Sequence, residues 1–140
     1  MNLILTKEDK DLFHQSCQEI IEKERVRLGI GTLSEKTVHA VLKKYLVPDE
    51  TCHEIRCGRY IVDILYGGEI MEIQTAGFNR LRAKLEEFLK EYEVTIVYPI
   101  PHIKWLIWID EETGEISKKR RSTKVGSFQE VFYELYKIKM

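Results

Sequence analysis

The chain has 140 residues, of which 44% are hydrophobic and 32% charged, and its formal net charge is −1 at pH 7. This composition is typical of one globular domain and excludes a disordered chain, and no stretch approaches the ~20 apolar residues of a membrane-spanning helix. The apolar run at the N-terminus is too short for a secretory signal, and three cysteines, an odd number, argue against a disulfide framework. We therefore expect a cytoplasmic protein of one domain, residues 1–140, with no membrane partner.

Charge is distributed unevenly along the chain. A strongly basic run occupies residues 117–124, three cations lie within residues 80–84, and residues 109–115 are acidic. A net charge near zero makes no case for nucleic-acid binding, but local patches decide the electrostatic field at a binding surface. A solvated surface is the simplest interpretation of each run taken alone.

Two helices are predicted before the first strand. Apolar residues recur at helical spacing through about residues 7–27, and Thr6 with Asp9 resembles an N-cap arrangement. After the break "GIGT", Ser34 can cap a second helix that runs to about residue 46.

Three strands and a third helix follow. The strands are predicted at residues 52–57, 59–65 and 69–75, separated by the glycine turns "CGR" and "YGGE", which suit tight hairpins. The helix is predicted at about residues 79–91.

The C-terminal part contains two more strands and a last helix. A buried strand is predicted at residues 94–100. A second strand is predicted at residues 104–110, in which Trp105 and Trp108 would lie on opposite faces. At least one of these tryptophans is expected in the core. An acidic turn then leads back to the basic run, and Ser127 with Glu130 forms a capping box for the final helix. The order of elements predicts a mixed α/β layer structure.

Two carboxylates interrupt the most strand-like region of the chain, "IVDILYGGEIMEIQT". Asp63 lies in the middle of one strand, and Glu72 and Gln74 share one face of the next. Pairing across the Gly-Gly hairpin brings Asp63 close to Glu72. Because converging carboxylates repel each other without a cation, and because Mg²⁺ and Mn²⁺ prefer such oxygen ligands, we expect a divalent metal site here. The competing interpretation is that these are polar residues of edge strands facing solvent.

The same pattern resembles the core of the PD-(D/E)XK nuclease superfamily, most closely archaeal Holliday-junction resolvases and small bacterial endonuclease-like proteins. That core carries Glu on its first helix, Asp on the second strand and Glu-x-Lys on the third. By position, Glu35 in "GTLSEKTVHAVL" corresponds to the helix Glu, and Asp63 and Glu72 correspond to the strand carboxylates. Gln74 stands where lysine is usual.

The resemblance implies a restriction-endonuclease-like αβββαβ core at residues 29–110. An N-terminal helical extension would occupy residues 1–28, and a basic hairpin return with a C-terminal helix would occupy residues 111–140. It also implies that Asp63, Glu72, the carbonyl of Ile73 and, through water, Glu35 hold Mg²⁺ or Mn²⁺ for phosphodiester hydrolysis. Gln74 departs from the family pattern, because an amide orients groups by hydrogen bonds but supplies no positive charge.

Several residues near these motifs have a simpler interpretation beside the functional one. Glu35 directly follows the predicted cap and would favour the helix dipole in that position without any other role. His39 is read as a surface histidine, and Glu54 as one half of an ordinary ion pair. The "CHEIRC" stretch fits no zinc-finger spacing.

Cations near the motifs are candidates for contacts with a nucleic-acid backbone, which position the ligand without reading its sequence. They are Arg80, Arg82, Lys84, Lys118, Lys119, Arg120 and Arg121. The leading hypothesis is a metal-dependent, structure-selective endonuclease acting on DNA, which by analogy with resolvases would be a homodimer. The alternatives are a catalytically inactive relative that binds nucleic acid or a protein, and a small-molecule or toxin-antitoxin module.

Overall fold

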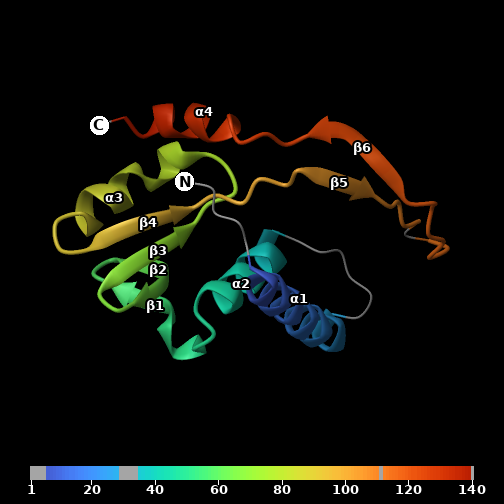
Figure 1. Cartoon of the computed structure of the whole chain (residues 1–140), viewed down its shortest axis with the longest axis horizontal. Helices are drawn as coiled ribbons and strands as arrows, with labels where there is room; N and C mark the ends of the chain where they lie inside the picture. The colour runs from blue at the N-terminus through green and yellow to red at the C-terminus, as the bar shows by residue number, and fades with distance from the viewer. Residues whose placement is uncertain (1–5, 29–34, 111, 140) are drawn as a thin grey trace. The chain divides into compact units, whose positions relative to one another are not determined.

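The computed structural model describes residues 6–28, 35–110 and 112–139, except for the side chains of residues 25–28 and 35. Its elements in chain order are α1 (Lys7–Leu28), α2 (Glu35–Leu46), β1 (His53–Cys57), β2 (Tyr60–Tyr66), β3 (Glu69–Ile73), α3 (Arg82–Phe88), β4 (Glu93–Val97), β5 (Ile103–Leu106), β6 (Arg120–Val125) and α4 (Glu130–Lys137) (Figure 1). Short 3₁₀ turns occupy Glu50–Cys52 and Phe78–Leu81. The predicted break at residues 29–32 and the predicted cap Ser34 lie outside the described residues.

The chain divides into two compact units. The first unit comprises Met1–Ile73 and Ala83–Val97, and the second comprises Gln74–Arg82 and Tyr98–Met140. No helix within the described part of the chain combines the length and the apolarity that crossing a membrane requires.

A mixed four-stranded sheet in the order β1-β2-β3-β4 forms the centre of the first unit. The pairs β1–β2 and β2–β3 are antiparallel, whereas β3 and β4 run parallel. Parallel neighbours need a crossover connection, and the segment that carries α3 supplies it. The predicted mixed α/β class is therefore confirmed.

Glycines close the β2–β3 hairpin in the predicted way. Gly67 and Gly68 both have positive φ, +60° and +85°. Two consecutive positive φ values match the right-handed twist of a tight hairpin, and glycine adopts them without steric cost. This turn sets the register that brings Asp63 and Glu72 together.

Apolar packing on the sheet positions α3. Val62, Ile70 and Phe88 are almost fully buried in one cluster with Cys57. The Phe88 ring also meets the edge of the Tyr60 ring, with centroids 5.7 Å apart. The helix is shorter than predicted, because a 3₁₀ turn forms its first part.

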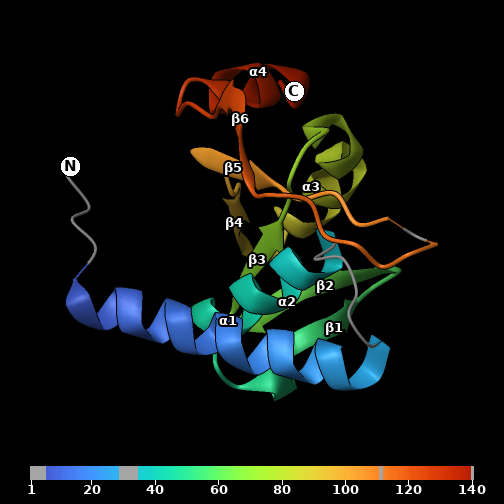
Figure 2. The same ribbon diagram turned by 90° about the vertical axis from the view of Figure 1, so that its right-hand side faces the viewer.

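The two N-terminal helices lie side by side in the first unit (Figure 2). The Thr6 hydroxyl accepts a hydrogen bond from the Asp9 backbone N–H at 3.1 Å, and the Thr6 N–H donates to the Asp9 carboxylate at 2.9 Å. This reciprocal cap satisfies two backbone donors at the helix start and confirms the predicted N-cap.

The second unit contains a two-stranded antiparallel ribbon, β5–β6, and the helix α4. The strand predicted at residues 104–110 is limited to Ile103–Leu106 and pairs with β6 in this separate sheet. Both tryptophans are exposed, Trp105 by 53% and Trp108 by 71%, so the prediction that one belongs to the core is wrong. A ribbon of two strands has few neighbouring side chains that could bury a large ring.

The cap predicted for the last helix is present in part. The Ser127 N–H donates to the Glu130 carboxylate at 3.1 Å. Glu134 of α4 accepts a hydrogen bond from the Phe78 N–H at 2.9 Å, which ties the helix to the 3₁₀ turn of the same unit.

Candidate functional site

Asp63 and Glu72 converge on neighbouring strands of the first unit. β2 pairs with β3 from Tyr66–Glu69 to Ile64–Met71, and the same register continued by one residue places Asp63 opposite Glu72. Side chains that lie opposite each other in an antiparallel pair share one face of the sheet. The Asp63 carboxylate accepts a hydrogen bond of 2.8 Å from the Ile73 N–H, which orients it at the end of the pairing.

The Glu72 carboxyl is the most buried ionisable group of this constellation. The residue is only 3% exposed, and its Oε1 atom has no hydrogen-bond partner among the described residues. Burial raises the pKa of Glu72 above its usual range, and the nearby negative charge of Asp63 raises it further, while Lys84 opposes the shift. An unpartnered buried carboxylate oxygen is the kind of atom that a metal ion or an ordered water satisfies.

Lys84, one of the candidate nucleic-acid contacts, brings a cation to Glu72, which was not predicted. Its ammonium donates to Glu72 Oε2 at 2.9 Å and to the carbonyl of Ile61 at 3.1 Å. Lys84 comes from α3, eleven residues beyond the end of β3 at Ile73. No local sequence pattern points to this contact, because Lys84 and Glu72 are twelve residues apart and lie on different elements.

His39 of α2 also approaches the carboxylates. Its Nδ1 lies 4.0 Å from Asp63 Oδ1, and its Nε2 is buried with no partner among the described residues. The His39 side chain is 26% exposed, so the residue is partly buried rather than the surface histidine that was expected.

Two predicted site residues make no described contact with these carboxylates. Glu35 is the first residue of α2, and its side chain lies outside the described residues. The Gln74 amide donates to the carbonyl of Ala76, two residues along the chain, so its hydrogen-bonding capacity is used locally.

The donor set suits a hard cation better than zinc. Within residues 6–28, 35–110 and 112–139, no group of three or more His, Cys, Asp or Glu side chains is arranged to hold a metal ion. Asp63 and Glu72 provide two carboxylates, which Mg²⁺ complements with waters and backbone carbonyls rather than with a full protein cage. The free Oε1 of Glu72 fits this requirement.

Some of the cations predicted to contact nucleic acid bind other residues of the described chain, and others are exposed. Arg82 donates to the carbonyl of Lys137 at 2.8 Å, within the second unit. Arg80 is exposed, as are the four cations at residues 118–121. Lys84, as described above, is engaged with Glu72.

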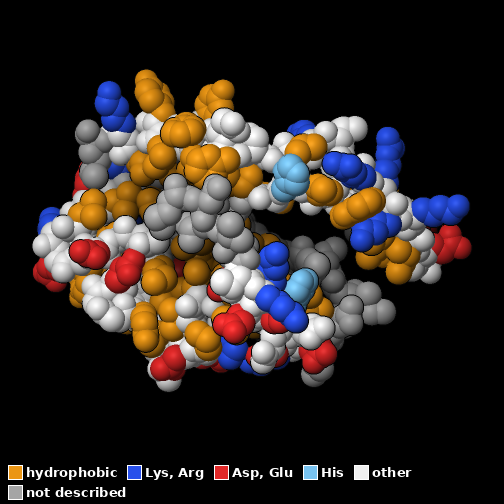
Figure 3. All heavy atoms as spheres, in the orientation of Figure 1, with side chains coloured by type: hydrophobic (Ala, Val, Ile, Leu, Met, Phe, Trp, Pro, Cys, Tyr) orange, Lys and Arg blue, Asp and Glu red, His pale blue; other side chains and the backbone are white. Residues whose placement is uncertain are grey.

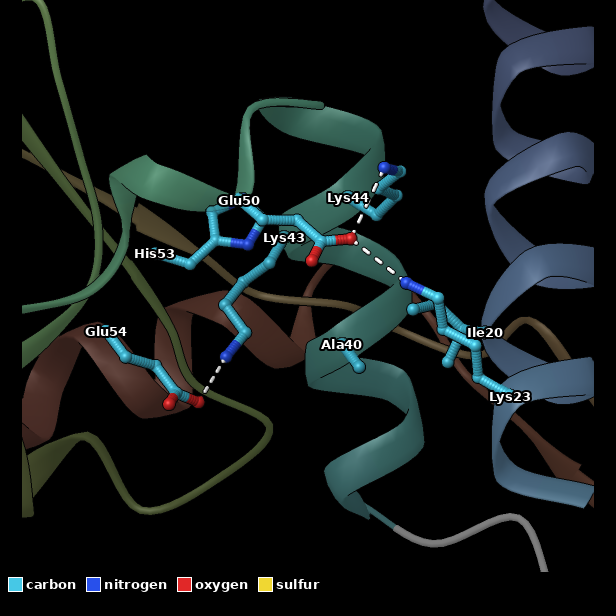
Figure 4. Close-up of a pocket in the computed structure, with 8 residues that line it drawn as sticks. All are labelled: Ile20, Lys23, Ala40, Lys43, Lys44, Glu50, His53 and Glu54. Atoms are coloured by element: carbon cyan, nitrogen blue, oxygen red, sulfur yellow. Dashed lines mark hydrogen bonds and ion pairs between the residues drawn. The ribbon is translucent and has the colours of Figure 1, made fainter. Parts of the chain in front are cut away.

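The pocket in Figure 4 is a structural ion-pair network of the first unit. It has a volume of about 290 Å³ and lies between α1, α2 and the start of β1. Glu50 accepts from Lys23 at 3.1 Å and from Lys44 at 3.4 Å, and Glu54 accepts from Lys43 at 2.7 Å (Figure 4). Glu54 thus forms the ordinary ion pair expected of it, and the lysines here are already neutralised.

Comparison with known proteins places the chain in a family. A protein of Treponema pallidum (strain Nichols), named "Uncharacterized protein", is 33% identical over 109 residues, which are 77% of this chain and 43% of that protein. The chain therefore spans less than half of that relative's length. No solved structure matches the chain. Residues 36–140, which include Asp63, Glu72 and Lys84, match the model of one family, and the chain belongs to it: Domain of unknown function (DUF8091).

Proposed function

We propose that this chain is a metal-dependent nuclease that hydrolyses phosphodiester bonds in DNA, built on the fold of the PD-(D/E)XK superfamily. The observation that carries the proposal is the convergence of Asp63 and Glu72 across the β2–β3 hairpin, with Lys84 bound to Glu72. The order of helix, three strands, helix and strand, with a parallel last pair, is compatible with that fold.

Asp63 and Glu72 are the proposed ligands of Mg²⁺ or Mn²⁺, with the Ile73 carbonyl and Glu35 as further candidates. When bound, such a cation lowers the pKa of an attached water and stabilises charge that develops on phosphate. The Ile73 N–H holds Asp63 in place, and the Oε1 of Glu72, which has no partner among the described residues, offers a lone pair to the site.

Lys84 is proposed to take the role that the lysine of the third strand has in the PD-(D/E)XK superfamily. An ammonium carries three protons. Glu72 and the Ile61 carbonyl accept two of them, which leaves one for a phosphate oxygen or the attacking water. A cation from α3 thereby compensates for the neutral amide at Gln74.

The substrate class and the assembly are proposed on the resemblance. Recognition of DNA structure rather than sequence is proposed by analogy with Holliday-junction resolvases. A homodimer is proposed by analogy with resolvases.

A second candidate function is binding of nucleic acid or a protein without cleavage. The Lys84–Glu72 ion pair favours it, because that pair neutralises the buried carboxylate without a metal. In that case the carboxylates would stabilise the fold, and cation binding would be absent.

Calorimetric titration with Mn²⁺ tests the proposal directly. The wild type is expected to bind, and Asp63→Ala and Glu72→Ala are each expected to abolish binding. Glu86→Ala removes an exposed carboxylate of the same helix as Lys84 and serves as the matched control. Circular dichroism of each variant establishes that it is folded.

Cleavage of branched, duplex and single-stranded DNA then separates the two candidates. The nuclease proposal predicts Mn²⁺-dependent cleavage of DNA. Asp63→Ala should remove this cleavage while the protein still binds DNA. If the wild type bound no Mn²⁺ and cleaved none of these substrates, the nuclease proposal would be rejected and the non-cleaving binding protein would remain.

A further inference from the structure

The β5–β6 ribbon presents aromatic rings to solvent. Trp105 and Trp108 are the only two tryptophans of the chain, and both are exposed. Every residue of β5 is exposed, and Ile107 and Ile109 beyond it are about half exposed as well. A run of exposed apolar side chains from Trp105 to Ile109 is a candidate interaction site.

The ribbon also carries a dense set of cations. They are Lys104 of β5, Arg120, Arg121 and Lys124 of β6, and Lys118 and Lys119 directly before β6. None of them forms an ion pair with a described residue, whereas Lys43, Lys84 and Lys90 of the first unit each do. Uncompensated like charges repel one another, so an anionic ligand that neutralises them would stabilise the ribbon.

Aromatic and basic side chains are interleaved along the ribbon. Trp105 lies directly opposite Arg121, and Leu106 lies opposite Arg120. The Lys119 ammonium lies 4.9 Å from the centroid of the Trp105 ring. Figure 3 shows the same mixture, with hydrophobic and basic side chains adjacent on the ribbon.

The acidic residues of this segment are confined to the turn that joins the strands. There the Asp110 carboxylate accepts hydrogen bonds from the N–H groups of Glu112 and Thr113, at 3.0 and 2.7 Å. This carboxylate therefore stabilises the turn, and the strand β6 itself contains only basic, hydroxyl and valine residues.

A ligand that matches this surface has flat apolar rings and closely spaced negative charges. Single-stranded nucleic acid has both, since its unpaired bases stack on aromatic side chains while its phosphates contact lysine and arginine. A duplex matches less well, because its base faces are already stacked on each other. An acidic protein would supply the charge but not a regular series of rings.

We propose that the β5–β6 ribbon binds single-stranded nucleic acid, with bases stacked on Trp105 and Trp108 and phosphates on the cations of β6. This inference rests on the proposed function only in taking nucleic acid as the ligand. It adds that unpaired strands are the preferred substrate class and that a second surface, apart from the carboxylates, holds them.

Intrinsic fluorescence provides the test, because the two tryptophans of the chain are Trp105 of β5 and Trp108, two residues beyond its end. The full chain is titrated in EDTA with a 15-nucleotide single-stranded DNA of mixed sequence. Saturable quenching is expected, since a stacked base quenches indole emission. Affinities of the variants come from fluorescence anisotropy of a labelled strand, and Trp105→Ala or Trp108→Ala is expected to weaken binding by roughly tenfold or more.

Salt dependence tests the ionic part of the surface. Each phosphate contact to a single strand contributes about −0.7 to the slope of log K against log salt. Arg120→Gln/Arg121→Gln is therefore expected to make the slope shallower by roughly 1.4. Lys7→Gln/Lys10→Gln removes the same charge from exposed positions of α1 and is expected to leave the slope unchanged.

Matched controls keep the aromatic test specific. Tyr133→Ala removes a ring of α4 that is 76% exposed, and it should leave the affinity unchanged. Trp105→Phe retains a stacking surface and should recover most of the affinity that Trp105→Ala loses.

Three outcomes would overturn the inference. The first is an affinity for a 15-base-pair duplex equal to or greater than that for the single strand. The second is an unchanged affinity in both tryptophan variants. The third is quenching that depends on protein concentration rather than on added DNA, together with a dimer in sedimentation that Trp108→Ala dissociates. That result would assign the ribbon to contact between two copies of the chain.

The assay also separates this inference from the proposed function. Binding in EDTA needs no metal, so Asp63→Ala should bind as the wild type does. Cleavage without ribbon-dependent binding would reject the ribbon inference alone, and binding without cleavage would reject the nuclease alone.

Discussion

Glu72 carries an energetic cost in the candidate site. A buried acceptor without a partner costs about 1–3 kcal/mol, and its Oε1 atom is in that state among the described residues. Lys84 compensates only the other oxygen of the carboxylate. Local violations of good packing chemistry are expected at functional sites, so this cost supports a ligand role for Glu72.

Glu72 makes stability fall as pH rises. Burial raises the pKa of the folded state above its ordinary value, so the folded protein holds the proton more tightly than the unfolded chain. Stability is therefore lost between the usual glutamate range and the raised pKa. Urea unfolding at pH 4 and pH 7.5 should show Glu72→Gln gaining relative to the wild type at the higher pH.

The opposite result would show that Lys84 outweighs burial. If the wild type gained relative to Glu72→Gln on raising the pH, the pKa of Glu72 would have to be lowered in the folded state. Protons also compete with metal for this carboxylate, so Mn²⁺ affinity is expected to fall as pH drops through the same pKa.

Replacing Lys84 by methionine tests how far the lysine compensates the buried Glu72 carboxylate. The substitution keeps much of the aliphatic stem but leaves Glu72 buried without a cation, which should lower the free energy of unfolding at pH 7 by about 1–3 kcal/mol. Mn²⁺ binding should persist and cleavage should be lost. Lys90→Met, which removes an exposed pair with Glu87, is the control and should change stability by less than about 1 kcal/mol.

At the scale of elements, the packing of α3 on the sheet supports the site. The helix brings Phe88 into the cluster with Val62 and Ile70, and one turn earlier it carries Lys84 to Glu72. The apolar anchor thereby positions the catalytic candidate, because both side chains belong to the same short helix.

Phe88→Ala is predicted to destabilise the first unit strongly. Truncation of a fully buried phenylalanine typically costs 3–5 kcal/mol through lost burial and the cavity that remains, so we expect about that loss in urea unfolding. The adjacent Leu89 is 51% exposed, and Leu89→Ala should cost less than about 1 kcal/mol. Equal losses in the two variants would show that α3 packs through a different face.

At the scale of the whole molecule, the two units differ in how their strands are supported. β2 and β3 each have a strand on both sides and bury Val62, Ile64 and Ile70 completely. β5 and β6 pair only with each other, and all but one of their residues are exposed.

Hydrogen exchange should reflect this difference. An isolated two-stranded ribbon is marginally stable, so amides of β5 and β6 should exchange through low-energy local opening, while amides of β2 and β3 should be among the most protected. Mass spectrometry of exchanged peptides measures both regions in one experiment. Saturating single-stranded DNA should slow exchange in β5 and β6, and equal protection of the two regions without DNA would contradict the expectation.

Much of the fold was predictable because its signals are local. Periodicity located all four helices and the strands of the main sheet to within a few residues, and the glycine pair at residues 67 and 68 identified the hairpin. Hairpin geometry follows from a few neighbouring residues, so the approach of Asp63 to Glu72 could be predicted without any distant contact. The separate pairing of β5 with β6 could not, because periodicity does not reveal which strand lies alongside.

The sequence by itself determined the order of elements, the α/β class and the facing carboxylates, since these depend on turn chemistry and side-chain alternation over short distances. Only the tertiary structure decided that Lys84 binds Glu72, that His39 lies beside Asp63, and that both tryptophans remain exposed. Each of these depends on which surfaces pack together. That choice is made by the burial of apolar area across the whole unit, which no local pattern contains.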